Sequence, residues 1–221
     1  MNRNGTGKQK EPVSSDQEQH QRQADEVAHA EEHGQLTAQA HTLEAVVSVL
    51  DEEHRQQVVA VWDELREKFG VADVFETPIP HFSYHVAGKY DGEALDAVLR
   101  QVAGEVAPFT ITTAGLGIFT GPQPVLYIPV ARNATLCALQ INLAQRLQPI
   151  ASKPVCHYLP ENWFPHITLA LGALEADKLA AIMAYLAPRS FHWHVRVNNL
   201  AVICDNCGVY GISSQYALTG D

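Results

Sequence analysis

The stretches PHFSY at residues 80–84 and PHITL at residues 165–169 decide how this chain folds. Each places a histidine, His81 or His166, directly after a proline and two residues before a hydroxyl side chain. The apolar residues around them are typical of strands. The two histidines lie 85 residues apart in a chain of 221 residues, so one pattern occurs twice, about one lobe apart.

The segments around the two stretches repeat as well. In both copies, the spacing of apolar residues predicts a helix, the strand with the histidine, a second helix and two further strands. The predicted elements are helix 55–69, strand 79–87, helix 92–102 and strands 109–119 and 125–130, followed by helix 134–147, strand 164–171, helix 176–186 and strands 191–204 and 208–213. An internal repeat of a mixed unit predicts two similar lobes. We therefore expect an α+β fold, a bilobal duplicated unit of mostly antiparallel sheets with outer helices and a central cleft.

The chain is predicted to have three parts. Residues 1–36 are rich in Gln, Glu, His and Ser and contain few large apolar side chains, which is typical of a disordered acidic and polar tail. Residues 37–54 have apolar residues at three- and four-residue steps, which predicts an N-terminal helical extension. Residues 55–221 form the duplicated domain, with lobes at about 55–132 and 133–221.

The composition of the chain limits the kinds of partner that it can bind. The net charge is −10, and the acidic residues concentrate in the first third of the chain, so no basic stripe of the kind that tracks long duplex nucleic acid is present. No apolar run reaches the length of a membrane span, and no secretory h-region is visible. Four cysteines in a chain of this length do not suggest a disulfide scaffold. We expect a cytoplasmic monomer that binds neither membranes nor long duplexes.

The spacing within each stretch predicts a shared site. On a strand, residues i and i+2 face the same way. His81 and Ser83 therefore lie on one face of their strand, and His166 and Thr168 lie on one face of theirs. These polar side chains would be costly in a sealed apolar core, and a cleft between the two lobes removes that cost. The cleft would then bring two imidazoles and two hydroxyls around one point.

Two imidazoles suit the chemistry of a phosphodiester. Displacement at phosphorus needs a base that activates the nucleophile and an acid that protonates the leaving oxygen. An imidazole with a pKa of about 6.5 can do either near neutral pH. Hydroxyl groups can donate hydrogen bonds to the non-bridging oxygens, where charge develops. This chemistry requires neither a metal nor a cofactor.

The two stretches resemble the paired His-x-Thr/Ser-x motifs of the two-histidine (2H) phosphoesterase superfamily, which includes the proteins named 2′-5′ RNA ligases. The second copy is a close match, and the first has Ser83 where threonine is commoner. The resemblance covers roughly residues 40–215. It implies a bilobal fold that opens 2′,3′-cyclic phosphates of RNA 3′ ends or small nucleotides to 2′-phosphates without a metal, with a reverse 2′-5′ ligase activity. It assigns His81 and His166 as the catalytic pair and Ser83 and Thr168 as phosphate-binding residues.

Further residues are candidates for lining the cleft. His85 lies four residues after His81, so strict alternation would place it on the same strand face. Aromatic side chains near the predicted strand ends and the loop before the second motif could stack on a base, although core packing is the alternative for each. The full set of candidates is His85, Tyr127, Tyr158, Trp163 and Tyr210.

Other interpretations stay open at this point. The two histidines could be satisfied sheet residues, but this reading must explain the same pattern twice. Cys204 and Cys207 form one C-x-x-C pair, for which His192 and His194 would be the nearest further zinc ligands, and two buried or turn cysteines are the simpler interpretation. The chain could also act on another cyclic or 2′-5′ linked oligonucleotide, or bind nucleotides without catalysis.

Overall fold

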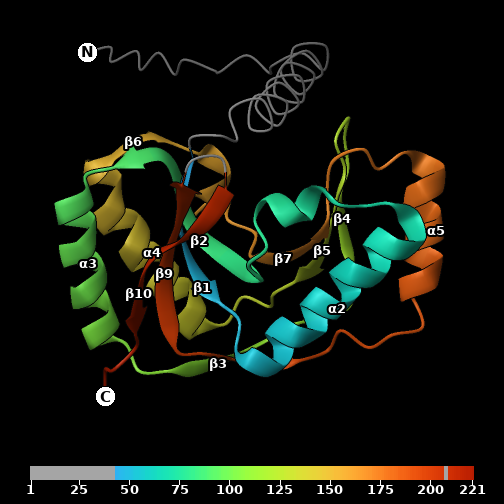
Figure 1. The fold of residues 1–221 in the computed structure, drawn as a ribbon. Coiled ribbons are helices and arrows are strands. Elements are labelled where there is room, and N and C mark those ends of the chain that lie inside the picture. The colour runs from blue at the N-terminus through green and yellow to red at the C-terminus, as the bar shows by residue number, and fades with distance from the viewer. Residues whose placement is uncertain (1–42, 207–208) are drawn as a thin grey trace, which may run out of the picture. The chain divides into compact units, whose positions relative to one another are not determined.

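The computed structural model describes residues 43–206 and 209–221, and in these residues four α-helices pack against antiparallel sheets (Figure 1). The chain divides into two units, residues 1–38 and residues 39–221. The predicted tail, residues 1–36, lies outside the described residues. The helices are α2 (Glu52–Phe69), α3 (Gly92–Glu105), α4 (Ala134–Leu147) and α5 (Ala176–Leu186), with short 3-10 helices η2 (Asp73–Glu76), η3 (Gln148–Ile150) and η4 (Cys156–Tyr158).

The strands form three sheets, and every pairing between the described strands is antiparallel. The largest sheet has the order β10-β9-β1-β2-β6, a smaller one has the order β4-β5-β7, and β3 pairs with β8. The strands are β1 (Glu44–Val49), β2 (His81–Tyr90), β3 (Phe109–Thr112), β4 (Gly117–Phe119), β5 (Val125–Pro129), β6 (Ala151–Pro154), β7 (His166–Ala170), β8 (His194–Val197), β9 (Asn199–Asn206) and β10 (Val209–Ala217). The α+β class with antiparallel sheets is confirmed.

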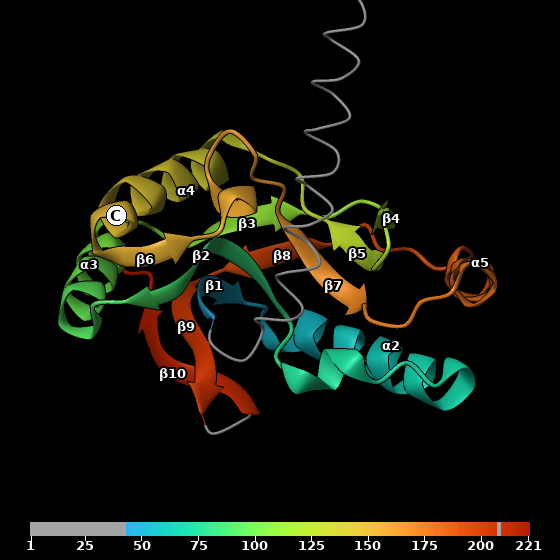
Figure 2. The same ribbon diagram turned by 90° about the horizontal axis from the view of Figure 1, so that it is seen from above.

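The helices divide between the two larger sheets. In Figures 1 and 2, α3 and α4 lie on the five-stranded sheet, whereas α2 and α5 lie beside the three-stranded sheet. The strand β7 forms one edge of the smaller sheet and lies next to β2 (Figure 2). The two strands that begin with the motif histidines are therefore neighbours, each from a different sheet.

The predicted lobe boundaries, about 55–132 and 133–221, do not match the sheets. The hairpin β4-β5 from the first half pairs with β7 from the second half, while β9 and β10 join the sheet of β2. The segments expected as single strands, 109–119 and 191–204, each break into two, so that the first piece pairs with its counterpart as β3 and β8. Each half of the sequence therefore contributes strands to both sheets.

The predicted helical extension, 37–54, is wrong for the residues that the structure describes before α2. Residues 44–49 form the strand β1, which pairs with β2 on one side and β9 on the other. A strand that is covered on both faces is apolar at successive positions, as Val46, Val47 and Val49 are. Such a run also satisfies helical spacing, which explains the error. Residues 37–42 lie outside the described part of the chain.

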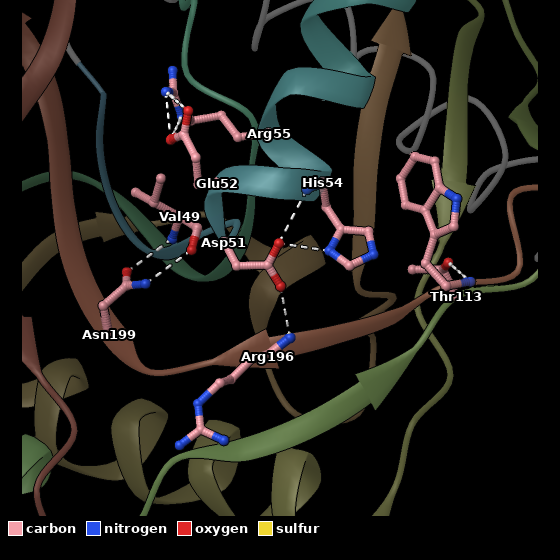
Figure 3. A network of polar contacts seen from close by, with 9 residues as sticks. Val49, Asp51, Glu52, His54, Arg55, Thr113, Arg196 and Asn199 are labelled. Carbon is pink, nitrogen blue, oxygen red and sulfur yellow. Dashed lines mark hydrogen bonds and ion pairs between the residues drawn. The ribbon is translucent and has the colours of Figure 1, made fainter.

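A polar network fixes the start of α2, as Figure 3 shows. Asp51 caps the helix: its Oδ1 accepts a hydrogen bond from the backbone N–H of His54 and lies 2.6 Å from the His54 Nδ1. Its Oδ2 accepts from the backbone N–H of Arg196 in β8. Burial raises the pKa of Asp51, but these hydrogen bonds outweigh it and lower the pKa below its ordinary value. The network joins α2 to the β3-β8 pair.

Among the described residues, the helices are too short or too polar to cross a membrane.

Candidate active site

The strands β2 and β7 begin in the same way. His81 and His166 are their first residues, and each follows a proline whose carbonyl accepts a backbone hydrogen bond from a neighbouring segment. Leu50 donates to the carbonyl of Pro80 at 3.1 Å, and Val130 donates to that of Pro165 at 3.0 Å. A proline directly before a strand interrupts no ladder, because its missing N–H would be needed only within the strand. The repeat seen in the sequence is thus also a repeat of backbone geometry.

Both imidazoles are held by a carbonyl two residues earlier. The Nδ1 of His81 lies 2.6 Å from the carbonyl oxygen of Ile79, and the Nδ1 of His166 lies 2.7 Å from that of Phe164. A carbonyl only accepts hydrogen bonds, so each Nδ1 must carry the proton. In both neutral rings the Nε2 is then the basic nitrogen. The arrangement prepares two equivalent groups that can each accept or donate a proton at Nε2.

The hydroxyl residues lie at one cavity with His81. Its volume is about 300 Å³, and Ser83 from β2 and Thr168 from β7 both contribute to its wall. His166 does not line this cavity, but a charge on His81 lowers the pKa of His166, which shows that the two rings are electrostatically coupled. The lining residues are Leu43, Ala45, Trp62, Asp73, Val74, Glu76, Thr77, Ile79, His81, Ser83, Val86, Tyr158, Thr168, Leu171, Ile203 and Tyr210.

Two tryptophans hold the backbone of the hydroxyl residues. The Nε1 of Trp163 donates to the carbonyl of Ser83 at 2.8 Å, and the Nε1 of Trp62 on α2 donates to the carbonyl of Thr168 at 3.0 Å. Both rings are almost completely buried. Large buried rings that also make a hydrogen bond have little freedom to move. Each motif strand is therefore fixed at the residue that carries the hydroxyl group.

Replacing Trp163 with phenylalanine is expected to destabilise the fold and slow turnover together. The substitution keeps most of the apolar volume but leaves the carbonyl of Ser83 without its buried donor, which costs about 1–3 kcal/mol. Urea unfolding should show this loss, and kcat should fall more than KM rises because Ser83 is misplaced. Tyr185→Phe, which removes a hydrogen bond to Glu64 between α2 and α5, is the control and should leave kcat unchanged. Unchanged stability and kcat in Trp163→Phe would show that the bond does not position Ser83.

The surroundings of the two histidines favour their neutral forms. Burial lowers the pKa of His81, and the carbonyl of Ile79 partly opposes that shift. Burial likewise lowers the pKa of His166, to about 4; the carbonyl of Phe164 opposes this shift and the charge of His81 adds to it. Because two adjacent imidazolium ions repel each other, the site holds one proton more readily than two. That condition is what an acid/base pair needs.

The cavity contains no lysine or arginine among the described residues that line it. Apart from His81, which can take up a proton, its charged side chains are two carboxylates, Asp73 and Glu76, both on η2. The negative charge of a phosphate could thus be met by a protonated imidazole and by the hydroxyl groups of Ser83 and Thr168. A ligand with several phosphates would be repelled by the carboxylates.

The prediction that His85 lines the cleft is wrong. The pairing of β1 with β2 shifts between Val46 and Val47, which leaves Tyr84 as an extra residue on β2. Such a β-bulge breaks the alternation of faces. His85 is therefore buried, only 1% exposed, with its Nδ1 2.6 Å from the hydroxyl of Tyr90, and Val86 lines the cavity in its place.

His85 should make the protein sensitive to acid. Burial lowers its pKa to about 4, whereas an unfolded histidine titrates at about 6.5. The unfolded state takes up the proton first, so stability present above pH 6.5 is lost as the pH falls towards 4, by about 3 kcal/mol. His85→Gln, which does not titrate and can still bond to Tyr90, should lose this part of the pH dependence in urea unfolding. The exposed His192→Gln should keep it. An unaltered pH dependence in His85→Gln would contradict the assignment.

The aromatic candidates have different positions. Tyr158 and Tyr210 line the cavity, and burial raises the pKa of Tyr158, an effect that a hydrogen bond with Ser83 only partly offsets. Tyr127 is buried but packs against His166, with ring centroids 5.4 Å apart. Trp163 does not line the cavity and belongs to the core. Two of these four candidates thus contribute to the cavity wall.

Several residues of the site were not predicted. Phe119 packs edge-on against His166 with ring centroids 4.9 Å apart, and Phe164 lies beside it. Phe164 could have been noticed in the sequence, because it lies two residues before His166. Phe119 could not, since its position depends on a hairpin that pairs with a strand from the other half of the chain.

The described residues contain no group of three or more His, Cys, Asp or Glu side chains suited to a metal ion. Cys204 lies on β9, and Cys207 lies outside the described residues. The rings of His192 and His194 lie 5.6 Å apart on the exposed side of the β8 region. The structure of the described residues thus offers no support for the zinc interpretation.

Comparison with solved structures supports the fold. TT0787 of Thermus thermophilus is 21% identical, with a TM-score of 0.58 over 81% of this chain and 99% of that chain. A phosphoesterase is 17% identical, with a TM-score of 0.54 over 80% and 99%. Escherichia coli LigT complexed with phosphate is 19% identical, with a TM-score of 0.51 over 80% and 98%. At these identities the likeness establishes a common fold.

Comparison of the sequence identifies the family. A search of curated proteins gave no match. The model of the 2′-5′ RNA ligase superfamily matches residues 51–206, which include both histidine motifs and all strands from β2 to β9. Since this match spans well over half of the chain, the protein belongs to the 2′-5′ RNA ligase superfamily of two-histidine phosphoesterases.

Proposed function

We propose that this protein is a phosphodiesterase that opens 2′,3′-cyclic phosphates of RNA 3′ ends or small nucleotides to 2′-phosphates without a metal ion. The observation that carries the proposal is the matched pair of imidazoles. His81 and His166 are held in the same tautomer by equivalent carbonyls, and their charges interact. A binding module alone would have no use for two such equivalent groups.

The proposed reaction is an in-line hydrolysis. One neutral imidazole takes a proton from water, whose oxygen attacks phosphorus. The bond from phosphorus to the ribose 3′-oxygen breaks, and the other imidazole, protonated at Nε2, gives that oxygen its proton. Ser83 and Thr168 donate hydrogen bonds to the non-bridging oxygens. The product keeps its phosphate on the 2′-oxygen, and a ribose 5′-hydroxyl in place of water would form a 2′-5′ phosphodiester by the same displacement of the 3′-oxygen.

The comparisons support a nucleotide ligand. Escherichia coli LigT, which has this fold, is known in complex with 3′-AMP. In this chain the cavity of about 300 Å³ has no described lysine or arginine on its wall. That charge distribution favours a ligand with one phosphate in the cleft over a polyphosphate.

The test is a panel of phosphodiesters assayed with a chelator present. The panel holds 2′,3′-cyclic mononucleotides, an RNA with a 2′,3′-cyclic end and a linear 2′-5′ dinucleotide. We expect the cyclic phosphates to be opened and the product to be the 2′-phosphate, identified by phosphorus NMR. Turnover of the 2′-5′ dinucleotide alone would reassign the substrate. A strict metal requirement, or nucleotide binding with no turnover of any member, would overturn the proposal.

A further inference from the structure

The cleft side of the smaller sheet continues beyond His166 as an aromatic surface. Residues that pair across antiparallel strands face the same way, and Tyr127 pairs with Thr168 on one side and with Gly117 on the other. A side chain at position 117 would collide with Tyr127, since a Cβ there would lie 2.4 Å from the ring. The glycine therefore lets the Tyr127 ring lie flat across β4.

Phe119 completes the floor of this surface. Its ring stacks on Tyr127 with centroids 4.1 Å apart and planes inclined by 29°. Its edge contact with His166 brings the surface directly to the imidazole. We call Phe119, Tyr127 and Phe164 the aromatic shelf.

Phe164 is the exposed part of the shelf. It packs edge-on against Phe119 and Tyr127 at 5.7 Å each, yet 48% of the residue is exposed. A phenylalanine that is exposed to this extent forgoes much of the burial that its ring could gain, and its exposed surface can contact a ligand. The carbonyl of the same residue accepts the hydrogen bond of the His166 Nδ1, so the backbone of Phe164 is fixed relative to the imidazole.

We propose that Phe164, backed by Phe119 and Tyr127, is the stacking platform for the nucleobase of the nucleotide whose phosphate lies between the histidines. This inference rests on the proposed function. A flat, neutral aromatic ring beside an imidazole that binds phosphate matches the two parts of a nucleotide, and stacking tolerates every base. None of the three aromatic residues lines the cavity described above, so the shelf is a separate subsite.

The shelf accounts for base binding without sequence readout. Its ring surfaces are those of Phe119, Phe164 and the buried Tyr127, and stacking is their main means of holding a base. Purines have more surface to stack than pyrimidines, so adenosine ligands should bind more tightly than uridine ligands. The expected preference is graded rather than absolute.

The test compares ligands with and without a base. Affinities for adenosine 2′-monophosphate, uridine 2′-monophosphate and inorganic phosphate are measured by calorimetry on the full chain. Phe164→Ala should weaken binding of adenosine 2′-monophosphate by about tenfold or more and leave that of phosphate unchanged. Phe164→Trp should restore it. Ile141→Ala, which removes a similarly exposed apolar side chain on α4, is the matched control and should match wild type.

The outcomes separate this inference from the proposed function. If wild type opens cyclic phosphates but Phe164→Ala binds both nucleotides as wild type does, the shelf is not the base platform. Equal weakening of phosphate and nucleotide would also overturn it, because Phe164 would then act by positioning His166. If no cyclic phosphate is opened, yet Phe164→Ala loses affinity for the nucleotides alone, the shelf stands and the proposed function fails.

Discussion

Replacing either His81 or His166 with alanine should lower kcat/KM on 2′,3′-cyclic phosphates by about 10²–10⁴-fold. A positioned general acid or base contributes roughly this factor. Each ring is held in place by its own carbonyl, that of Ile79 or Phe164, so neither ring can move to take over the role of the other. Removing both should cost little more than removing one, because groups that act as a unit are not additive. Initial rates with a cyclic mononucleotide measure all three variants.

A matched control uses a histidine outside the cleft. His192 is exposed in the β8 region, and His192→Ala should keep wild-type kcat/KM. Wild-type turnover in His81→Ala or His166→Ala would remove that residue from the mechanism. Loss of folding is excluded if the variants keep the wild-type urea midpoint.

A leaving group that needs no proton then separates the two roles. 4-Nitrophenolate departs from a phosphodiester without protonation, so the variant that lacks the acid should lose far less on such an ester than on a cyclic phosphate. The variant that lacks the base should lose a similar factor on both substrates, since water must still be activated. Equal losses for both variants on both substrates would contradict a division into acid and base.

The sequence predicts which residues of the two motifs share a strand face, because that relation is local. The i, i+2 spacing decides that His81 faces with Ser83 and His166 faces with Thr168 on any strand. The repeat of the motif was then enough to predict two strands that meet at a cleft. These inferences need no knowledge of which other strands pair with them.

The errors concern features that depend on non-local pairing. The β-bulge at Tyr84 turns the side chain of His85 to the opposite face of β2 from His81. No residue type in the sequence marks that bulge. The residues of β1 predict a helix, because the two buried faces of this strand give an apolar run with mixed spacing. The pairing of the hairpin β4-β5 with β7, which brings Phe119 to His166, likewise cannot be predicted from the spacing of apolar residues.

The pH dependence of kcat/KM should have its maximum on the acid side of pH 6.5. The free enzyme is competent when one imidazole is neutral and the other is charged. Burial lowers the pKa of His81 below its ordinary value and that of His166 to about 4, so the singly protonated pair is most abundant between the two apparent pKa values. Above the higher value the acid is lost, and kcat/KM should fall by about tenfold for each pH unit.

The profile of kcat should lie at higher pH than that of kcat/KM. A bound phosphate brings a negative charge next to the imidazoles, which favours the charged form and raises the pKa of the acid. The described cavity wall carries no lysine or arginine, so the proton has no competing cation in neutralising that charge. Initial rates from pH 4.5 to 8.5 measure both profiles, and His85→Gln tests whether loss of the fold limits the acid side. A maximum of kcat/KM at pH 6.5 or above would show that the surroundings of the histidines do not lower their pKa values, and the effect of burial inferred for them would then be wrong.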